Sequence, residues 1–84
     1  MRFDLALHGL RLFKSRSQAN VAIQDGAALL NGQVVKPSHG VRPGDRITLN
    51  GLAGRRLIEV LALPHASLTR TAARDLLREV GGDP

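Results

Sequence analysis

The segment between Ser15 and Gly26 carries both a start signal and a stop signal for a helix, which constrains the length of one element. Ser15 is a residue type that caps helix N-termini, and Gln18 follows three residues later, the spacing of a capping box. Gly26 readily takes the left-handed conformation that often follows a helix end. The apolar positions between these signals recur at helical spacing: Ala19, Ala22 and Ile23. The pattern predicts a helix that begins after Ser15, ends before Gly26 and buries one face.

A second helix is predicted upstream, over residues 4–13. Leu7 and Leu10, with Phe3 just before them, recur at the i, i+4, i+7 spacing of one apolar helix face. Gly9 lowers the helix propensity of this segment by about 1 kcal/mol relative to Ala, unless it serves a close packing contact. We expect the two helices to form the N-terminal part of the fold.

Beyond Gly26 the sequence changes to short apolar runs separated by turn residues, which predicts strands at 27–30, 33–35, 46–49 and 56–63. Asn31 and Gly32, between the first two runs, are a strong hairpin signal because both tolerate positive φ. Pro37 cannot donate a hydrogen bond to a sheet and should end the second strand. A last helix is predicted at 69–80, followed by a tail at 81–84.

These elements predict an α+β fold in which two N-terminal helices pack on a small, mostly antiparallel sheet of four to five strands, with a C-terminal helix. A chain of 84 residues is long enough for one small domain. We place that domain at 1–80, with a core motif at 2–49 and a C-terminal strand and helix at 55–80.

The charge of the chain indicates a polyanionic partner. The formal net charge is +5, and the first 46 residues hold seven Lys and Arg against three Asp and Glu. Lys14 and Arg16 flank the predicted start of the second helix, where backbone N–H groups already favour anions. Arg11 lies three residues before Lys14. Lys36-Pro37-Ser38 forms a second basic corner. We interpret both corners as phosphate-binding, with a merely solubilising surface as the alternative.

Several reaction classes have no residues to support them. The chain has no Cys, and its three His residues are scattered without metal-ligand spacing. We therefore expect no metal, no cofactor, no small-molecule substrate and no catalytic residue, so that the protein is not an enzyme. Since no apolar run approaches the roughly 20 residues of a membrane span and no signal peptide is present, we expect a cytoplasmic protein without membrane contact.

The shortage of aromatic residues limits how this chain can read a nucleic acid. Proteins that read single strands stack bases on exposed aromatic rings. Phe3 and Phe13 are the two aromatic residues, and both occupy expected core positions. Recognition should therefore rest on phosphates, 2′-hydroxyl groups and the shape of the RNA helix.

A longer pattern of residues resembles a known RNA-binding family. It consists of Arg2-Phe3-Asp4, Leu7, Phe13-Lys14-Ser15-Arg16-Ser17, Ala19, Ile23, Gly26, Asn31-Gly32, Lys36-Pro37-Ser38, Val41 and Gly44-Asp45. Over residues 2–49 this pattern resembles the RNA-binding domain named after ribosomal protein S-four, which also occurs in pseudouridine synthases and tyrosyl-tRNA synthetases. With the strand and helix expected to follow, the chain is similar to the heat-shock protein fifteen family.

The resemblance implies an alpha-L motif and non-catalytic, ribosome-associated binding of structured RNA, above all ribosomal RNA on the large subunit, with a heat-shock-like role. We expect a monomer. The RNA-binding positions of the family, carried over residue by residue, are joined here by Arg11 from the charge pattern. The predicted RNA-binding set is therefore Arg2, Arg11, Lys14, Ser15, Arg16, Gln18, Lys36, Pro37 and Ser38.

Other interpretations of the chain stay open. One is a protein-interaction or assembly module whose basic face meets an acidic protein, and another is the detached RNA-targeting part of an RNA-modifying enzyme. Arg55 and Arg56 are left open between RNA contact and solvent. The arginines of the predicted last helix recur every four residues, and we interpret them as a solvated face: Arg70, Arg74 and Arg78.

Overall fold

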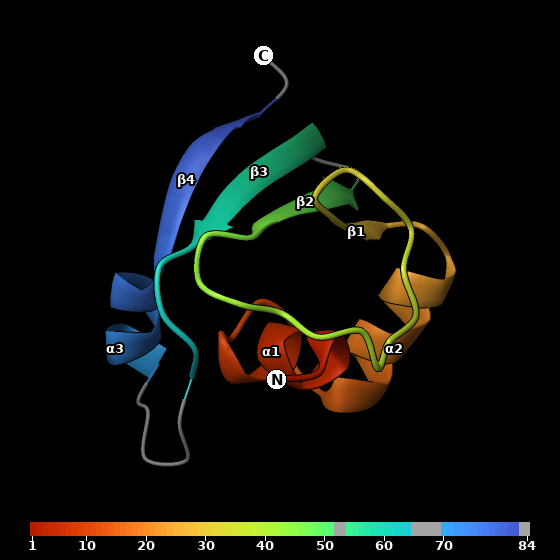
Figure 1. Ribbon diagram of the computed structural model, residues 1–84, viewed down its shortest axis with the longest axis horizontal. Coiled ribbons are helices and arrows are strands. Elements are labelled where there is room, and N and C mark those ends of the chain that lie inside the picture. The colour runs from red at the N-terminus through yellow and green to blue at the C-terminus, as the bar shows by residue number, and fades with distance from the viewer. Residues whose placement is uncertain (52–53, 65–69, 83–84) are drawn as a thin grey trace.

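The computed structural model describes residues 1–51, 54–64 and 70–82, and it consists of two helices that cover one face of a four-stranded sheet (Figure 1). In chain order the elements are α1 (Phe3–Gly9), α2 (Arg16–Gln24), β1 (Ala28–Leu30), β2 (Arg46–Gly51), β3 (Gly54–Val60), α3 (Arg70–Ala73), the 3-10 turn η1 (Arg74–Leu76) and β4 (Leu77–Gly82). No helix in these ranges has the length and hydropathy to cross a membrane.

The sheet has the strand order β1-β2-β3-β4, and its three strand pairs are all antiparallel. The register places Leu30 opposite Ile47 and Ile47 opposite Ile58. This arrangement confirms the predicted α+β fold of two N-terminal helices on a small antiparallel sheet.

The core lies between the helices and one face of the sheet. Phe3 and Leu7 of α1, together with Ile23 of α2, are fully buried against Ile47 of β2 and Val60 of β3. The predicted helix faces are thus confirmed at these positions. Because burial of each such side chain is worth about 1.5–3 kcal/mol, this layer supplies most of the packing that holds α1 and α2 on the sheet.

The predicted C-terminal helix at 69–80 is wrong over its second half. The chain is helical at Arg70–Ala73 and forms a 3-10 turn at Arg74–Leu76, but Leu77–Gly82 is strand β4. Leu77 pairs with Val60 and packs against the core. Since the backbone of β3 needs hydrogen-bond partners on this side, pairing with β3 overrides the local helical spacing. The predicted tail is also wrong at Gly81 and Gly82, which belong to β4, and its last two residues lie outside the described ranges.

The predicted strand at 33–35 is also wrong. Asn31 and Gly32 have φ angles of 51° and 79°, as the hairpin turn requires, but the pairing beyond them is a single bridge between Leu30 and Gln33. The chain then leaves the sheet for the start of α1, where the carbonyls of Pro37 and His39 accept hydrogen bonds. The need of α1 for N-terminal acceptors thus directs this segment away from the sheet.

Helix α1 ends at Gly9, four residues before its predicted end. The N–H of Leu12 donates to the carbonyl of Leu7 at 3.1 Å and the N–H of Arg11 to that of His8 at 3.0 Å, which is a complete Schellman motif. Arg11 therefore occupies the left-handed position, with φ 64°, where Gly is the usual residue. The end was missed because the sequence carries no glycine there, whereas Gly26, with φ 77°, was predicted correctly for α2.

Gly9 serves a close packing contact. A Cβ atom at this position would lie 2.6 Å from Cγ and 2.9 Å from Cβ of Pro64, which is buried. The absence of a side chain at Gly9 is therefore what lets the chain after β3 cross over the end of α1.

We expect Gly9→Ala to destabilise the protein by about 1–2 kcal/mol, because overpacking against Pro64 outweighs the better helix propensity of Ala. Urea unfolding followed by circular dichroism measures this change. In a Pro64→Gly background, which removes both ring atoms that the new Cβ would meet, the same substitution should cost much less. An equal cost in both backgrounds, or a gain in stability from Gly9→Ala alone, would contradict the packing role of Gly9.

Candidate nucleic-acid interface

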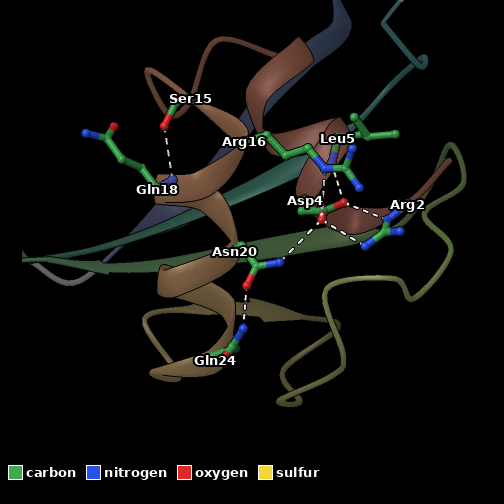
Figure 2. Close-up of polar contacts among 8 residues, drawn as sticks. All are labelled: Arg2, Asp4, Leu5, Ser15, Arg16, Gln18, Asn20 and Gln24. Carbon is green, nitrogen blue, oxygen red and sulfur yellow. Dashed lines mark hydrogen bonds and ion pairs between the residues drawn. The ribbon is translucent and has the colours of Figure 1, made fainter.

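Asp4 is a fully buried carboxylate in the first turn of α1, and it joins three parts of the chain (Figure 2). Arg2 donates to it through Nε at 3.0 Å and Nη2 at 3.1 Å, in a bidentate pair. From α2, Arg16 Nε donates at 3.2 Å and Asn20 Nδ2 at 3.5 Å. The backbone N–H of Leu5 donates at 2.8 Å. We call Arg2, Asp4, Arg16 and Asn20 the Asp4 cluster.

The electrostatics of the cluster keep Asp4 charged. Burial by itself raises the pKa of Asp4, but hydrogen bonds from Arg2, Arg16 and the Leu5 N–H together outweigh burial and lower that pKa below its usual value. Asp4 is therefore ionised at neutral pH. One carboxylate against two guanidinium groups leaves the cluster with a net positive charge.

The Asp4 cluster orients its two arginines without enclosing them. The side chains of Arg2 and Arg16 are 43% and 48% exposed, whereas that of Asp4 is fully buried. A guanidinium group has five N–H donors, so the single bond from Arg16 Nε uses a small part of its capacity. Both arginines can thus bind an external anion while Asp4 holds them in place.

The loop at 36–39 lies against this cluster because it supplies acceptors to α1. The N–H of Asp4 donates to the carbonyl of Pro37 at 3.1 Å, and that of Phe3 to the carbonyl of His39 at 2.8 Å. Lys36 and Ser38 are exposed on either side of Pro37. The structure therefore brings the backbone of the predicted corner Lys36-Pro37-Ser38 to the start of α1, where Arg2 and Asp4 lie, although more than thirty residues separate them in the sequence.

The start of α2 confirms part of the predicted capping. Ser15 Oγ accepts a hydrogen bond from the N–H of Gln18 at 3.1 Å, so Ser15 is the N-cap. The side chain of Gln18 points away from the Asp4 cluster (Figure 2). The structure thus gives Ser15 a structural role and does not bring Gln18 to the Asp4 cluster.

A shallow hollow forms at the Asp4 cluster, and it includes residues outside the predicted RNA-binding set. Ser17 and Val21 line it together with the four cluster residues. Asn20 is not among the predicted site residues, yet it forms hydrogen bonds with both Asp4 and Gln24. No local signal marks Asn20, because its role depends on the packing of α2 against α1.

Arg11 and Lys14 lie at a second shallow hollow, which is lined by the segment 11–14 between the two helices. Arg11 was predicted to lie inside the helix at 4–13. In the structure it follows the end of α1 and has the left-handed conformation. Apart from Gln18, the predicted RNA-binding residues therefore fall into two groups, one around Asp4 and the loop at 36–38, the other in the α1–α2 turn.

The chemistry of these hollows suits phosphate. Among the described residues no group of three or more His, Cys, Asp or Glu could hold a metal ion. Phe3 is fully buried and Phe13 packs partly buried against the core, so neither forms a stacking platform. Half-exposed guanidinium and ammonium groups around open hollows bind phosphates by charge-assisted hydrogen bonds.

We expect Asp4→Asn to lower the free energy of unfolding by about 2 kcal/mol at neutral pH, because the substitution removes charge-assisted hydrogen bonds to Arg2 and Arg16. The pKa of Asp4 is lower in the folded protein than in the unfolded chain. The contribution of ionised Asp4 to stability is therefore complete above the ordinary Asp pKa of about 3.9 and disappears as the pH falls through the pKa of Asp4 in the folded protein. The stability difference between the two proteins should therefore shrink in acid.

Urea unfolding at neutral pH and at about pH 2.5, well below the ordinary Asp pKa, measures this difference. Asp25→Asn is the matched control, because Asp25 is an exposed carboxyl at the end of α2 and its replacement should change stability by less than about 0.5 kcal/mol. A difference for Asp4→Asn that stays constant with pH would refute the ionised role of Asp4.

Comparisons with known proteins agree with this arrangement. Residues 1–47 match the S4 domain family. An RQC P-site tRNA stabilizing factor from Helicobacter pylori is 39% identical over 64 residues, which cover 76% of each chain. One from Bacillus subtilis is 37% identical over 60 residues, which cover 71% of this chain and 67% of that protein. The trimeric structure of Vibrio cholerae heat shock protein 15 has a TM-score of 0.88 at 31% identity, covering 95% of this chain and 81% of that chain.

The family match spans α1, α2, β1 and the start of β2, and so includes both groups of predicted RNA-binding residues. The likeness to the Vibrio cholerae structure extends over the C-terminal elements as well. This chain therefore belongs to the S4 domain family of RNA-binding proteins, in the ribosome-associated group that includes heat shock protein 15 and the RQC P-site tRNA stabilizing factors.

Proposed function

We propose that this protein binds the backbone of a structured RNA on the large ribosomal subunit and catalyses no reaction. The observation that carries the proposal is the Asp4 cluster, which holds Arg2 and Arg16 half-exposed beside the basic loop at 36–38. The second group, Arg11 and Lys14, extends the positive surface into the α1–α2 turn. The proposed surface groups the predicted residues differently from the two corners of the sequence, because Arg16 lies with Arg2 at Asp4 and Lys14 lies with Arg11.

The relatives narrow the class of RNA. The relatives that are 39% and 37% identical to this chain are RQC P-site tRNA stabilizing factors. We propose that this chain contacts a tRNA at that site together with neighbouring ribosomal RNA. Both are folded into A-form helices, whose phosphates and 2′-hydroxyl groups a protein without exposed aromatic rings can read. A protein with this role acts in the cytoplasm, where ribosomes translate.

The mechanism is positioning by fixed charges. The hydrogen bonds to Asp4 already restrict the conformations of the Arg2 and Arg16 side chains. The binding of a phosphate therefore costs less side-chain entropy. Each phosphate contact releases counterions from the RNA, which supplies much of the binding free energy and makes it dependent on salt. Base sequence contributes little, since the contacts go to the RNA backbone.

We expect Lys14→Gln and Lys36→Gln each to weaken binding to structured RNA several-fold, because each removes a cation from one of the two groups. The slope of log K against log salt should fall by about 0.7–0.9 for each phosphate that the variant no longer neutralises. Fluorescence anisotropy with a labelled tRNA and with a ribosomal RNA fragment, over a salt series, measures both quantities.

Arg55→Gln is the matched control for these variants. Arg55 is exposed near the start of β3 and is one residue out of phase with Arg56, Ile58 and Val60, so it lies on the face of the sheet away from the helices. Its replacement removes the same charge and should leave the slope nearly unchanged. Equal effects from all three variants, or none from Lys14→Gln and Lys36→Gln, would refute the proposed surface. Release of a product from RNA by the purified protein would refute the non-catalytic role.

A further inference from the structure

A third hollow adjoins the second group of predicted RNA-binding residues and lies between the α1–α2 turn and the C-terminal elements. Three arginines from separate parts of the chain line it: Arg11 after α1, Arg56 in β3 and Arg74 in η1. Leucine side chains form much of the remaining lining: Leu10, Leu12 and Leu77. Arg56 and Arg74 follow the region that matches the S4 domain family, which ends at residue 47.

The fold brings these arginines together by three independent constraints. The Schellman motif places Arg11 at the left-handed residue that ends α1. Arg56 is in phase with Ile58 and Val60, so it lies on the helix-facing side of the sheet. The N–H of Leu61 donates to the carbonyl of Leu76 at 2.7 Å, which fixes η1, and with it Arg74, against the end of β3.

The charge of this third hollow favours an anion. Arg56 donates to Glu79 through Nε at 2.9 Å, but both side chains are 55% exposed. An ion pair this exposed is weak, so Glu79 orients Arg56 while leaving its guanidinium group accessible. Arg74 is also exposed. Together with Arg11, these residues give the hollow three guanidinium groups, and the Glu79 carboxylate lies beside that of Arg56.

We infer that this third hollow binds further backbone phosphates of the same RNA, so that the contact surface runs from Lys14 through Arg11 to Arg56 and Arg74. Arg11 is the link, because it lines both the hollow beside Lys14 and this one. Guanidinium groups bind phosphate oxygens in bidentate geometry, which suits an extended chain of phosphates. The inference rests on the proposed RNA binding and adds a second contact region from the C-terminal elements.

The backbone at Arg11 agrees with this assignment. A residue other than glycine in the left-handed region costs roughly 1–2 kcal/mol, and such strain tends to occur at functional sites. Arg11→Gly removes the guanidinium group and relieves the strain. We expect this variant to fold at least as stably as the parent protein and yet to bind RNA more weakly.

The decisive comparison uses two double variants with the same change of charge. Arg56→Gln with Arg74→Gln removes two cations from the third hollow. Arg78→Gln with Arg46→Gln removes two cations from the opposite face of the sheet. Arg78 pairs with Glu59 across β3 and β4 just as Arg56 pairs with Glu79, and Arg46 lies opposite Glu59 in the register of β2 and β3. Circular dichroism and thermal unfolding establish that both double variants fold.

We expect the Arg56/Arg74 variant to lose affinity for structured RNA by tenfold or more and its salt slope to fall by about 1.4–1.8, the change that two phosphates produce, while the control changes little. Equal losses of affinity in both double variants would overturn the inference, since net charge alone would then explain binding. An unchanged Arg56/Arg74 variant, with Lys14→Gln still impaired, would overturn the inference and leave the proposed function standing. If Lys14→Gln were also unimpaired, both would fail.

The same variants distinguish RNA from an acidic protein as the ligand of the third hollow. If a ribosomal protein docked there, the Arg56/Arg74 variant would bind intact large subunits more weakly but would bind protein-free RNA as the parent protein does. That result would overturn the inference. Parallel losses of affinity for intact subunits and for protein-free RNA would support it.

Discussion

The buried carboxylate of Asp4 is the interaction on which the N-terminal half of this structure depends. It accepts hydrogen bonds from Arg2 before α1, from Arg16 and Asn20 in α2 and from the Leu5 N–H. A buried charge is costly unless it is paired, so folding of this region requires both arginines to turn toward one point. The same requirement leaves their outer sides exposed next to each other, where an RNA phosphate can reach them.

The backbone of α1 connects this cluster with the loop that precedes β2. The first N–H groups of the helix need acceptors, and the carbonyls of Pro37 and His39 supply them. Figure 1 shows the consequence: the segment between β1 and β2 runs past the helices rather than along the sheet. One helix start therefore fixes the loop that carries Lys36 and Ser38, so the same backbone hydrogen bonds stabilise the fold and shape the proposed RNA-binding surface.

The C-terminal elements complete the sheet and enlarge its basic surface. Strand β4 pairs with β3, and the ion pairs of Arg56 with Glu79 and of Arg78 with Glu59 lie on opposite faces of that pair. Burial of Pro64 against Gly9 brings the chain after β3 back over α1. As a result, the end of α1 meets η1 and β3, and Arg11 lies near Arg56 and Arg74.

Local signals in the sequence determined α2, the turn at Asn31 and Gly32 and the buried apolar faces, because caps, φ preferences and periodicity act over a few residues. Tertiary structure decided the rest. The end of α1 was hidden because Arg11 occupies a position typical of glycine, and Asn20 acquired its role only when α2 packed against α1. The predicted last helix became η1 and β4 since an unpaired strand of the sheet gains more from a partner than a short helix gains from its spacing.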